Sequence, residues 1–224
     1  PPALPARTAG SRGHETIYQA LYVQGKGTLR EELKREKALR SGRVQRIPRS
    51  HLPPKAGRSW LQDAHISTRP AAAQDRAVPG HIEGDLVIGR GGHSALITLI
   101  DRCTRYTLIR RLPERHDAPT VATTLIDMVA DLPQHLRQTL TWDQGGEMAA
   151  CADFTLATDC QVFFCDPHSP WQRPTNENLN GLVRDFYPKG TNFRDITDTQ
   201  IAEMQDLLNG RPRRVLQWHT PTEK

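Results

Sequence analysis

Three carboxylates stand at positions where a sequence rarely leaves an unpaired acid. Asp85 lies in the middle of "HIEGDLVI" (81–88), an apolar run typical of a β-strand. Asp143 ends "TLTWD" (139–143) and precedes a flexible Gln-Gly-Gly turn. Glu177 lies 34 positions later, on the first turn of a segment whose apolar residues recur at helical spacing. Burying a lone carboxylate is costly, and sheets present functional groups at strand ends, so these acids are candidates for chemistry.

The chemistry that suits three converging acids is metal binding. A helix packed on a mixed sheet can bring together Asp85, Asp143 and Glu177. Three such carboxylates repel each other unless cations lie among them, so we expect Glu177 to stand off when no metal is bound. Oxygen ligands suit Mg²⁺ or Mn²⁺. Two of these ions about 3.5–4 Å apart can activate water or a hydroxyl and stabilise the leaving oxygen of a phosphodiester.

The segments that must position the acids alternate in a recognisable order. Three strand-like runs are followed by helix, strand, helix, strand, helix and helix, which predicts an α/β fold with a mixed five-stranded sheet flanked by helices. The expected strands are 81–88, 94–101, 106–112, 139–143 and 161–165. The expected helices are 117–132, 147–158, the segment containing Glu177, and 197–209, where Thr197 or Asp198 is the expected cap.

Charge is distributed unevenly along the 224 residues, whose net charge is +5. Residues 26–58 hold 11 Lys or Arg and 3 Glu, a local balance of +8, whereas residues 59–224 have a balance of −4. A basic block on an acidic body predicts a polyanion partner, namely nucleic acid, with a solvated linker as the alternative. Within this block we expect Arg43, Arg46 and Arg49 to contact phosphates.

Composition shifts divide the chain into four regions. We expect a disordered start at 1–13, a helical region at 14–40 with helices at 14–23 and 28–40, a basic Pro-rich linker at 41–79, and the α/β body at 80–224. The first residue is Pro rather than Met, which suggests a fragment of a longer chain. The sequence contains no run of 18 apolar residues and no visible signal peptide, so no membrane partner is expected.

The four cysteines are interpreted as reduced cytosolic thiols, because none forms a CxxC pair. Cys160, Cys165 and His168 are conceivable zinc ligands. Their spacing matches no usual zinc site, so buried thiols are the preferred interpretation.

Several longer motifs resemble a known family. "GHIEGDLV", "DRCTRYTLI", "LTWDQG", "FFCDPHSPWQRPTNENLNGLVRDFYPKGT" and "LNGRPRRVLQWHTP" are similar, in this order, to the integrase core of bacterial insertion-sequence transposases of the insertion-sequence-thirty family. The resemblance covers residues 14–224. It implies a ribonuclease-H-like fold and a triad of two aspartates and one glutamate, carried onto Asp85, Asp143 and Glu177. It departs from the family at Ile82, usually Trp, and at Pro174, usually Gly.

The resemblance also implies an activity and partners. A transposase would cleave DNA with Mg²⁺ or Mn²⁺, using two ions as described above, and would join the freed 3′-hydroxyl to target DNA. Its partners would be double-stranded DNA, at element ends and target, and further copies of itself, in the bacterial cytoplasm near the nucleoid. Residues 14–40 would be the remnant of a helix-turn-helix region. The alternatives are a binding-only fragment or repressor derived from a transposase, and a structure-specific nuclease with the same core.

Other polar residues near the acids have two interpretations. Glu83 and Asp101 are expected to be structural, in a hydrogen-bonded strand and in a turn respectively, and Asp166 is expected to form a turn. Asn176 and Asn180 offer amides that could orient Glu177 or contact DNA. The remaining candidates for DNA contact outside the basic block are His168, Arg173, Arg184 and Lys189.

Overall fold

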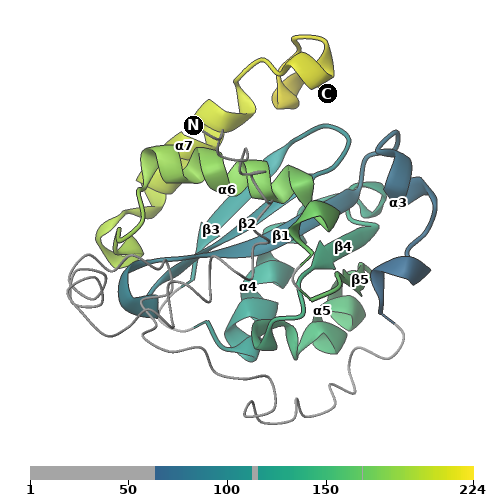
Figure 1. The fold of residues 1–224 in the computed structure, drawn as a ribbon, viewed down its shortest axis with the longest axis horizontal. Coiled ribbons are helices and arrows are strands. Elements are labelled where there is room, and N and C mark those ends of the chain that lie inside the picture. Colours follow the sequence, from purple (N-terminus) through teal and green to yellow (C-terminus); the bar gives the residue numbers. More distant parts are fainter. Residues whose placement is uncertain (1–63, 113–115, 168) are drawn as a thin grey trace, which may run out of the picture. The chain divides into compact units, whose positions relative to one another are not determined.

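The computed structural model describes residues 64–112, 116–167 and 169–224 (Figure 1). The chain divides into two compact units, Pro1–Gly57 and Arg58–Lys224, and the described residues all belong to the second. The helices expected at 14–23 and 28–40, the basic block at 26–58 and His168 lie outside the described residues.

A mixed five-stranded sheet forms the centre of the second unit, as the sequence predicts. Its spatial order is β3-β2-β1-β4-β5. β1 pairs antiparallel with β2, and β2 with β3, because short connections join them; β1–β4 and β4–β5 are parallel, with helices in the connections. The strands are β1 (His81–Ile88), β2 (Ala95–Asp101), β3 (Thr107–Arg111), β4 (Thr139–Trp142) and β5 (Gln161–Phe164).

Helices cover both faces of the sheet and enclose two apolar cores (Figure 1). On one face, α4 (Ala118–Val129) and α5 (Cys151–Thr158) pack around the buried ring of Trp142. On the other face, α6 (Pro174–Phe186) and α7 (Asp198–Asn209) bury apolar residues at helical spacing against β1, β2 and β3. The helix order and type predicted from the sequence are therefore confirmed.

Local signals fix where the site-bearing helices begin. Pro174 is the first residue of α6, where its fixed φ and missing N–H suit a helix start. Thr197 caps α7 in a capping box with Gln200. Asp117 caps α4 by accepting a hydrogen bond from the Thr120 N–H.

Short 3₁₀ helices fill most connections: η4 (Arg90–Gly92), η5 (Gln134–Leu136), η6 (Gly146–Met148), η7 (Pro170–Gln172), η8 (Phe193–Asp195), η9 (Arg214–Leu216) and η10 (Pro221–Glu223). Within the part of the chain that the structure describes, no helix has the length and apolar character needed to cross a membrane.

Residues 64–79 differ from the extended linker that the sequence predicts for 41–79. They form η3 (Ile66–Thr68) and the short helix α3 (Ala72–Asp75), in which Ala73 is fully buried. His65 bridges to Phe164 at the edge of the sheet, where the Phe164 N–H donates to the Ala64 carbonyl at 2.6 Å. The open hydrogen-bonding edge of β5 explains why this proline-containing segment packs on the body.

Candidate active site

Strand register brings Asp85 and Asp143 together. The parallel pairing of β1 with β4 places Glu83 beside Thr141, so two residues further along both strands Asp85 and Asp143 are neighbours on one face. Gly84 permits this close pairing, because a Cβ there would overlap the Trp142 ring and lie 2.9 Å from Leu99 Cδ2. The opposite outcome, aspartates on opposite faces, would have excluded a shared site.

One guanidinium lies between the two aspartates. Arg173, the residue before α6, has Nη1 at 3.6 Å from Asp85 Oδ1 and Nη2 at 3.9 Å from Asp143 Oδ2. Its Nη1 also donates to the Gly84 carbonyl at 2.5 Å, and the residue is only 6% exposed. In the structure the Arg173 guanidinium is buried between the two carboxylates. Pairing of this kind lowers the electrostatic repulsion between two adjacent carboxylates. The DNA contact predicted for Arg173 from the sequence stays a prediction.

Asp85 is the more enclosed of the two aspartates. Burial raises the pKa of Asp85, the Arg173 guanidinium opposes that shift, and the charge of Asp143 adds to it. Asp85 Oδ1 accepts the Leu86 N–H and Oδ2 accepts Asn180 Nδ2, both at 2.9 Å. Asp143 is about half exposed, and its Oδ1 accepts the Gly145 N–H at 3.0 Å. The Asp143 carboxylate therefore faces solvent, while Asp85 is held by the protein.

Asn180 orients Asp85 and is itself oriented. The Thr98 hydroxyl lies 3.2 Å from Asn180 Oδ1 and 3.3 Å from Asn176 Oδ1. A donor at the Asn180 oxygen leaves its NH₂ group to face Asp85. In the structure Asn180 donates to Asp85 rather than to Glu177, and its predicted contact with DNA stays a prediction. Asn176 is 1% exposed, so its side chain is not presented at the surface.

A buried ion pair fixes the start of α6. Glu83 is fully buried, its Oε1 accepts Arg102 Nε at 2.9 Å, and its Oε2 accepts the Asn176 N–H at 2.9 Å. The carboxylate thus satisfies one of the free N–H groups in the first turn of α6 and favours the helix dipole. The structural role expected for Glu83 is confirmed. So is that of Asp101, whose carboxylate accepts the backbone N–H groups of Gly80, Cys103 and Thr104.

Glu177 lies on the first turn of α6, as predicted, but its side chain is exposed. Among the described residues no hydrogen bond or ion pair links its carboxylate to another side chain, and no set of three Asp, Glu, His or Cys residues is placed to hold a metal ion. The structure brings Asp85 and Asp143 together. Glu177 lies on α6, the helix that carries Asn180, but its carboxylate contacts neither aspartate. The three-acid site remains a prediction.

A fourth acid near Asp143 was missed by sequence reasoning. Glu147, on η6, accepts a hydrogen bond from Trp142 Nε1 at 3.3 Å. Burial raises the pKa of Glu147, and the neighbouring charge of Asp143 raises it further. The available signal was its place four residues after Asp143, just past the Gly-Gly turn. The neighbourhood of Asp143 is therefore more acidic than a triad alone implies.

Comparison with known proteins identifies the relatives of the chain. Residues 75–170 match the integrase core domain family. The transposase for insertion sequence element IS1086 of Cupriavidus metallidurans is 42% identical over 222 residues, covering 99% of this chain and 64% of the relative. Transposase InsI for element IS30C of Escherichia coli is 40% identical over 215 residues, covering 93% and 54%. The transposase for element IS4351 of Bacteroides fragilis is 32% identical, covering 94% and 63%.

This chain is a homologue of the IS30-family transposases. The mixed sheet flanked by helices is consistent with the ribonuclease-H-like fold of an integrase core. The chain spans 64% of the first of these relatives and 54% of the second.

The other residues predicted to contact DNA in this transposase homologue lie in different environments. Arg184 Nη2 donates to the Ile88 carbonyl at 2.7 Å, and its guanidinium lies 5.8 Å from the centre of the Phe193 ring. Lys189 is exposed beyond the end of α6. Arg43, Arg46 and Arg49 lie outside the described residues. DNA contact by these residues stays a prediction.

The thiol interpretation of Cys160 and Cys165 is confirmed. Both are buried and free, and burial raises the pKa of Cys160 to about 12 and that of Cys165 to about 11. Such thiols stay protonated at neutral pH.

Proposed function

We propose that this chain carries the catalytic core of a transposase that cleaves a DNA strand at the end of an insertion element and transfers the freed 3′-hydroxyl to target DNA. The observation that carries the proposal is the pair Asp85 and Asp143, held side by side around a cation in an integrase core. Homology to transposases over nearly the whole chain supports the substrate.

The residues present fit a divalent metal ion by their donor chemistry. Asp85 and Asp143 supply carboxylate oxygens that already share one positively charged partner, and Glu177 supplies a third carboxylate on an exposed side chain. We infer that these three acids hold Mg²⁺ or Mn²⁺. When bound, such ions lower the pKa of an attacking hydroxyl and stabilise the charge on the leaving oxygen.

The chain's own residues prepare this site in three ways. Asn180 holds one Asp85 oxygen, so that carboxylate keeps its orientation. Glu83 and Arg102 fix the start of α6, which sets where Glu177 begins. Arg173 neutralises the two aspartates before cations arrive, and its guanidinium must yield space or share the carboxylates when they do.

The direct test uses labelled duplex DNA ending in the element's own terminal sequence, incubated with the full transposase chain. Strand cleavage and joining to a second duplex are expected with Mg²⁺ or Mn²⁺ and absent with EDTA. Cleavage that persists in EDTA would contradict the metal mechanism. Binding without any cleavage in either metal would leave the binding-only protein as the better account.

One observation favours that second candidate, a DNA-binding repressor. Arg173 occupies the space between the aspartates. In a protein that does not catalyse a reaction, this ion pairing would be enough to neutralise the two carboxylates without a metal ion. The two accounts separate on cleavage: the catalytic core should cut element-end DNA in Mn²⁺, whereas the repressor should bind that DNA and leave it intact.

A further inference from the structure

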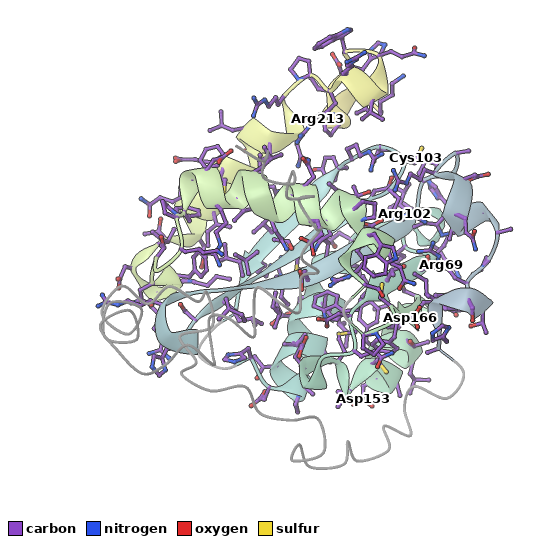
Figure 2. All side chains as sticks on the ribbon, in the orientation of Figure 1. Arg69, Arg102, Cys103, Asp153, Asp166 and Arg213 are labelled. Carbon is purple, nitrogen blue, oxygen red and sulfur yellow. The ribbon has the colours of Figure 1, made fainter. Side chains whose placement is uncertain are left out.

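A cavity of about 240 Å³ lies along the flank of α6, outside the carboxylate site. Thr175 and Asn178 of α6 form part of its wall. Three arginines from separate segments reach it: Arg76 after α3, Arg105 in the turn between β2 and β3, and Arg213 beyond α7. We call this cavity with its three arginines the arginine pocket. Figure 2 shows Arg213 in the yellow C-terminal segment beside α6.

The arginine pocket holds positive charge that the described protein does not neutralise. No acid lines the cavity, and within the described ranges no ion pair involves its three arginines. Arg105 Nη1 donates to the Thr175 hydroxyl at 2.6 Å, and Arg213 Nη2 donates to the Leu208 carbonyl at 3.1 Å. Both acceptors are uncharged. The two acids whose charge reaches Arg105, Glu83 and Asp101, do not line the pocket. Glu83 is paired with Arg102, and Asp101 accepts backbone N–H groups.

Hydrogen-bonding capacity in the pocket is also left over. The Nε atoms of Arg105 and Arg213 are buried without a partner, which costs free energy unless a ligand supplies an acceptor. Burial lowers the pKa of Arg105, and the charge of Arg76 lowers it further. An anion with several oxygens would supply the missing charge and the missing acceptors together.

We propose that the arginine pocket binds a phosphate group of a DNA strand. Guanidinium groups present a planar fork that matches phosphate oxygens. The first turn of the 13-residue helix α6 adds a favourable dipole at the same place, with the Thr175 hydroxyl nearby. Asn178 of the pocket directly follows Glu177 in α6, so the pocket and the predicted metal site share the first turns of this helix. The assignment rests on the proposed function for its choice of DNA as the source of the phosphate.

The test measures binding without chemistry. The full chain is titrated against a labelled duplex in EDTA at several salt concentrations, followed by fluorescence anisotropy. Arg76→Gln is the first variant, because among the described residues the Arg76 side chain has no hydrogen bond to lose. We expect its affinity at low salt to fall about tenfold, and the slope of log affinity against log salt to shrink by about one. Arg110→Gln, exposed on β3 and outside the pocket, is the matched control and should bind like the parent.

A second variant and a second ligand complete the test. Arg105→Lys keeps the charge but loses the fork, so its affinity should fall less than that of Arg105→Gln. Unchanged DNA affinity and salt slope in Arg76→Gln and Arg105→Gln would overturn the proposal. A second outcome would also overturn it. If inorganic phosphate raises the Tm of the parent but not of Arg76→Gln, while the two proteins bind DNA with equal affinity, the pocket is a site for free anions rather than for DNA. Loss of cleavage has no bearing here, because binding in EDTA is independent of the proposed chemistry.

Discussion

At the scale of the residue, the ionised Asp85 carboxylate lowers the stability of the fold when Arg173 is the only cation near it. Burial raises its pKa above the ordinary value of 3.8, and the Arg173 guanidinium offsets this only in part. Between the ordinary pKa and the raised one the folded state binds more protons than the unfolded state, so stability falls as pH rises through that window. The ionised form of Asp85 is the one that a metal would stabilise.

Asp85→Asn should therefore raise the Tm at pH 7 in EDTA. The variant removes a buried negative charge, and its advantage should narrow as pH falls toward 3.8 and below, where the parent carboxyl is also neutral. Thermal melts at several pH values measure this. Asp127→Asn, exposed on α4, is the control and should melt like the parent throughout. A destabilised Asp85→Asn at pH 7 would show that the ion pair with Arg173 outweighs burial.

The sequence could indicate which acids are candidates for a site but not which side chains surround them. Asp85 and Asp143 were conspicuous because one interrupts an apolar strand and the other ends one. The insertion of Arg173 between them was not predictable, because it depends on where η7 delivers the chain to the sheet. The exposed position of Glu177 depends on how α6 is rotated about its axis. The sequence indicates which face of the helix carries Glu177 but not how exposed that face is.

At the scale of the element, the site depends on how closely β1 and β4 approach. Gly84→Ala should be strongly destabilising, by about 1–3 kcal/mol or more, because its Cβ would overlap the buried Trp142 ring. Gly181→Ala is the matched change in α6, where nothing lies within 4 Å of an added Cβ, and it should stabilise by about 0.5–1 kcal/mol. Urea unfolding measures both. Equal effects of the two changes would contradict the close strand packing.

The second element-scale prediction concerns the anchor of α6. Glu83→Ala should cost about 3–5 kcal/mol, because it leaves the buried Arg102 guanidinium unpaired. Changing both partners to Met should cost less than Glu83→Ala alone. Asp198→Ala, which breaks the exposed pair with Arg111, should cost only about 0–1 kcal/mol. If the single and double changes at Glu83 and Arg102 are equally destabilising in urea unfolding, the ion pair is not what anchors the helix.

Sequence periodicity predicted the order and type of the helices and strands. The helices α4, α6 and α7 each bury apolar residues on one side, and α4 and α7 also begin at a capping residue, Asp117 and Thr197. The prediction failed for residues 64–79, where composition indicated a linker. Their packing depends on the free edge of β5, a long-range feature that local composition does not carry.

At the scale of the whole molecule, we expect the basic block at 26–58 to bind DNA without sequence preference and the more acidic body to carry the chemistry. Changing Arg43, Arg46 and Arg49 together to Ala should weaken the binding of all duplexes alike and reduce its salt dependence, because fewer counterions are released. Anisotropy titrations of the full chain with two unrelated duplexes measure this. Affinity that is insensitive to salt in the parent would make the block a linker only.

The central claim is that Asp143 belongs to a metal site that cuts DNA, and one substitution tests it most directly. Asp143→Asn keeps the shape of the side chain and removes one charge beside Asp85 and Arg173. Cleavage of labelled element-end DNA by the full chain in Mg²⁺ should fall by about three orders of magnitude or more, while DNA affinity holds or rises slightly. Asp127→Asn should cleave normally. Full cleavage by Asp143→Asn would contradict the account and leave DNA binding as the function of this chain.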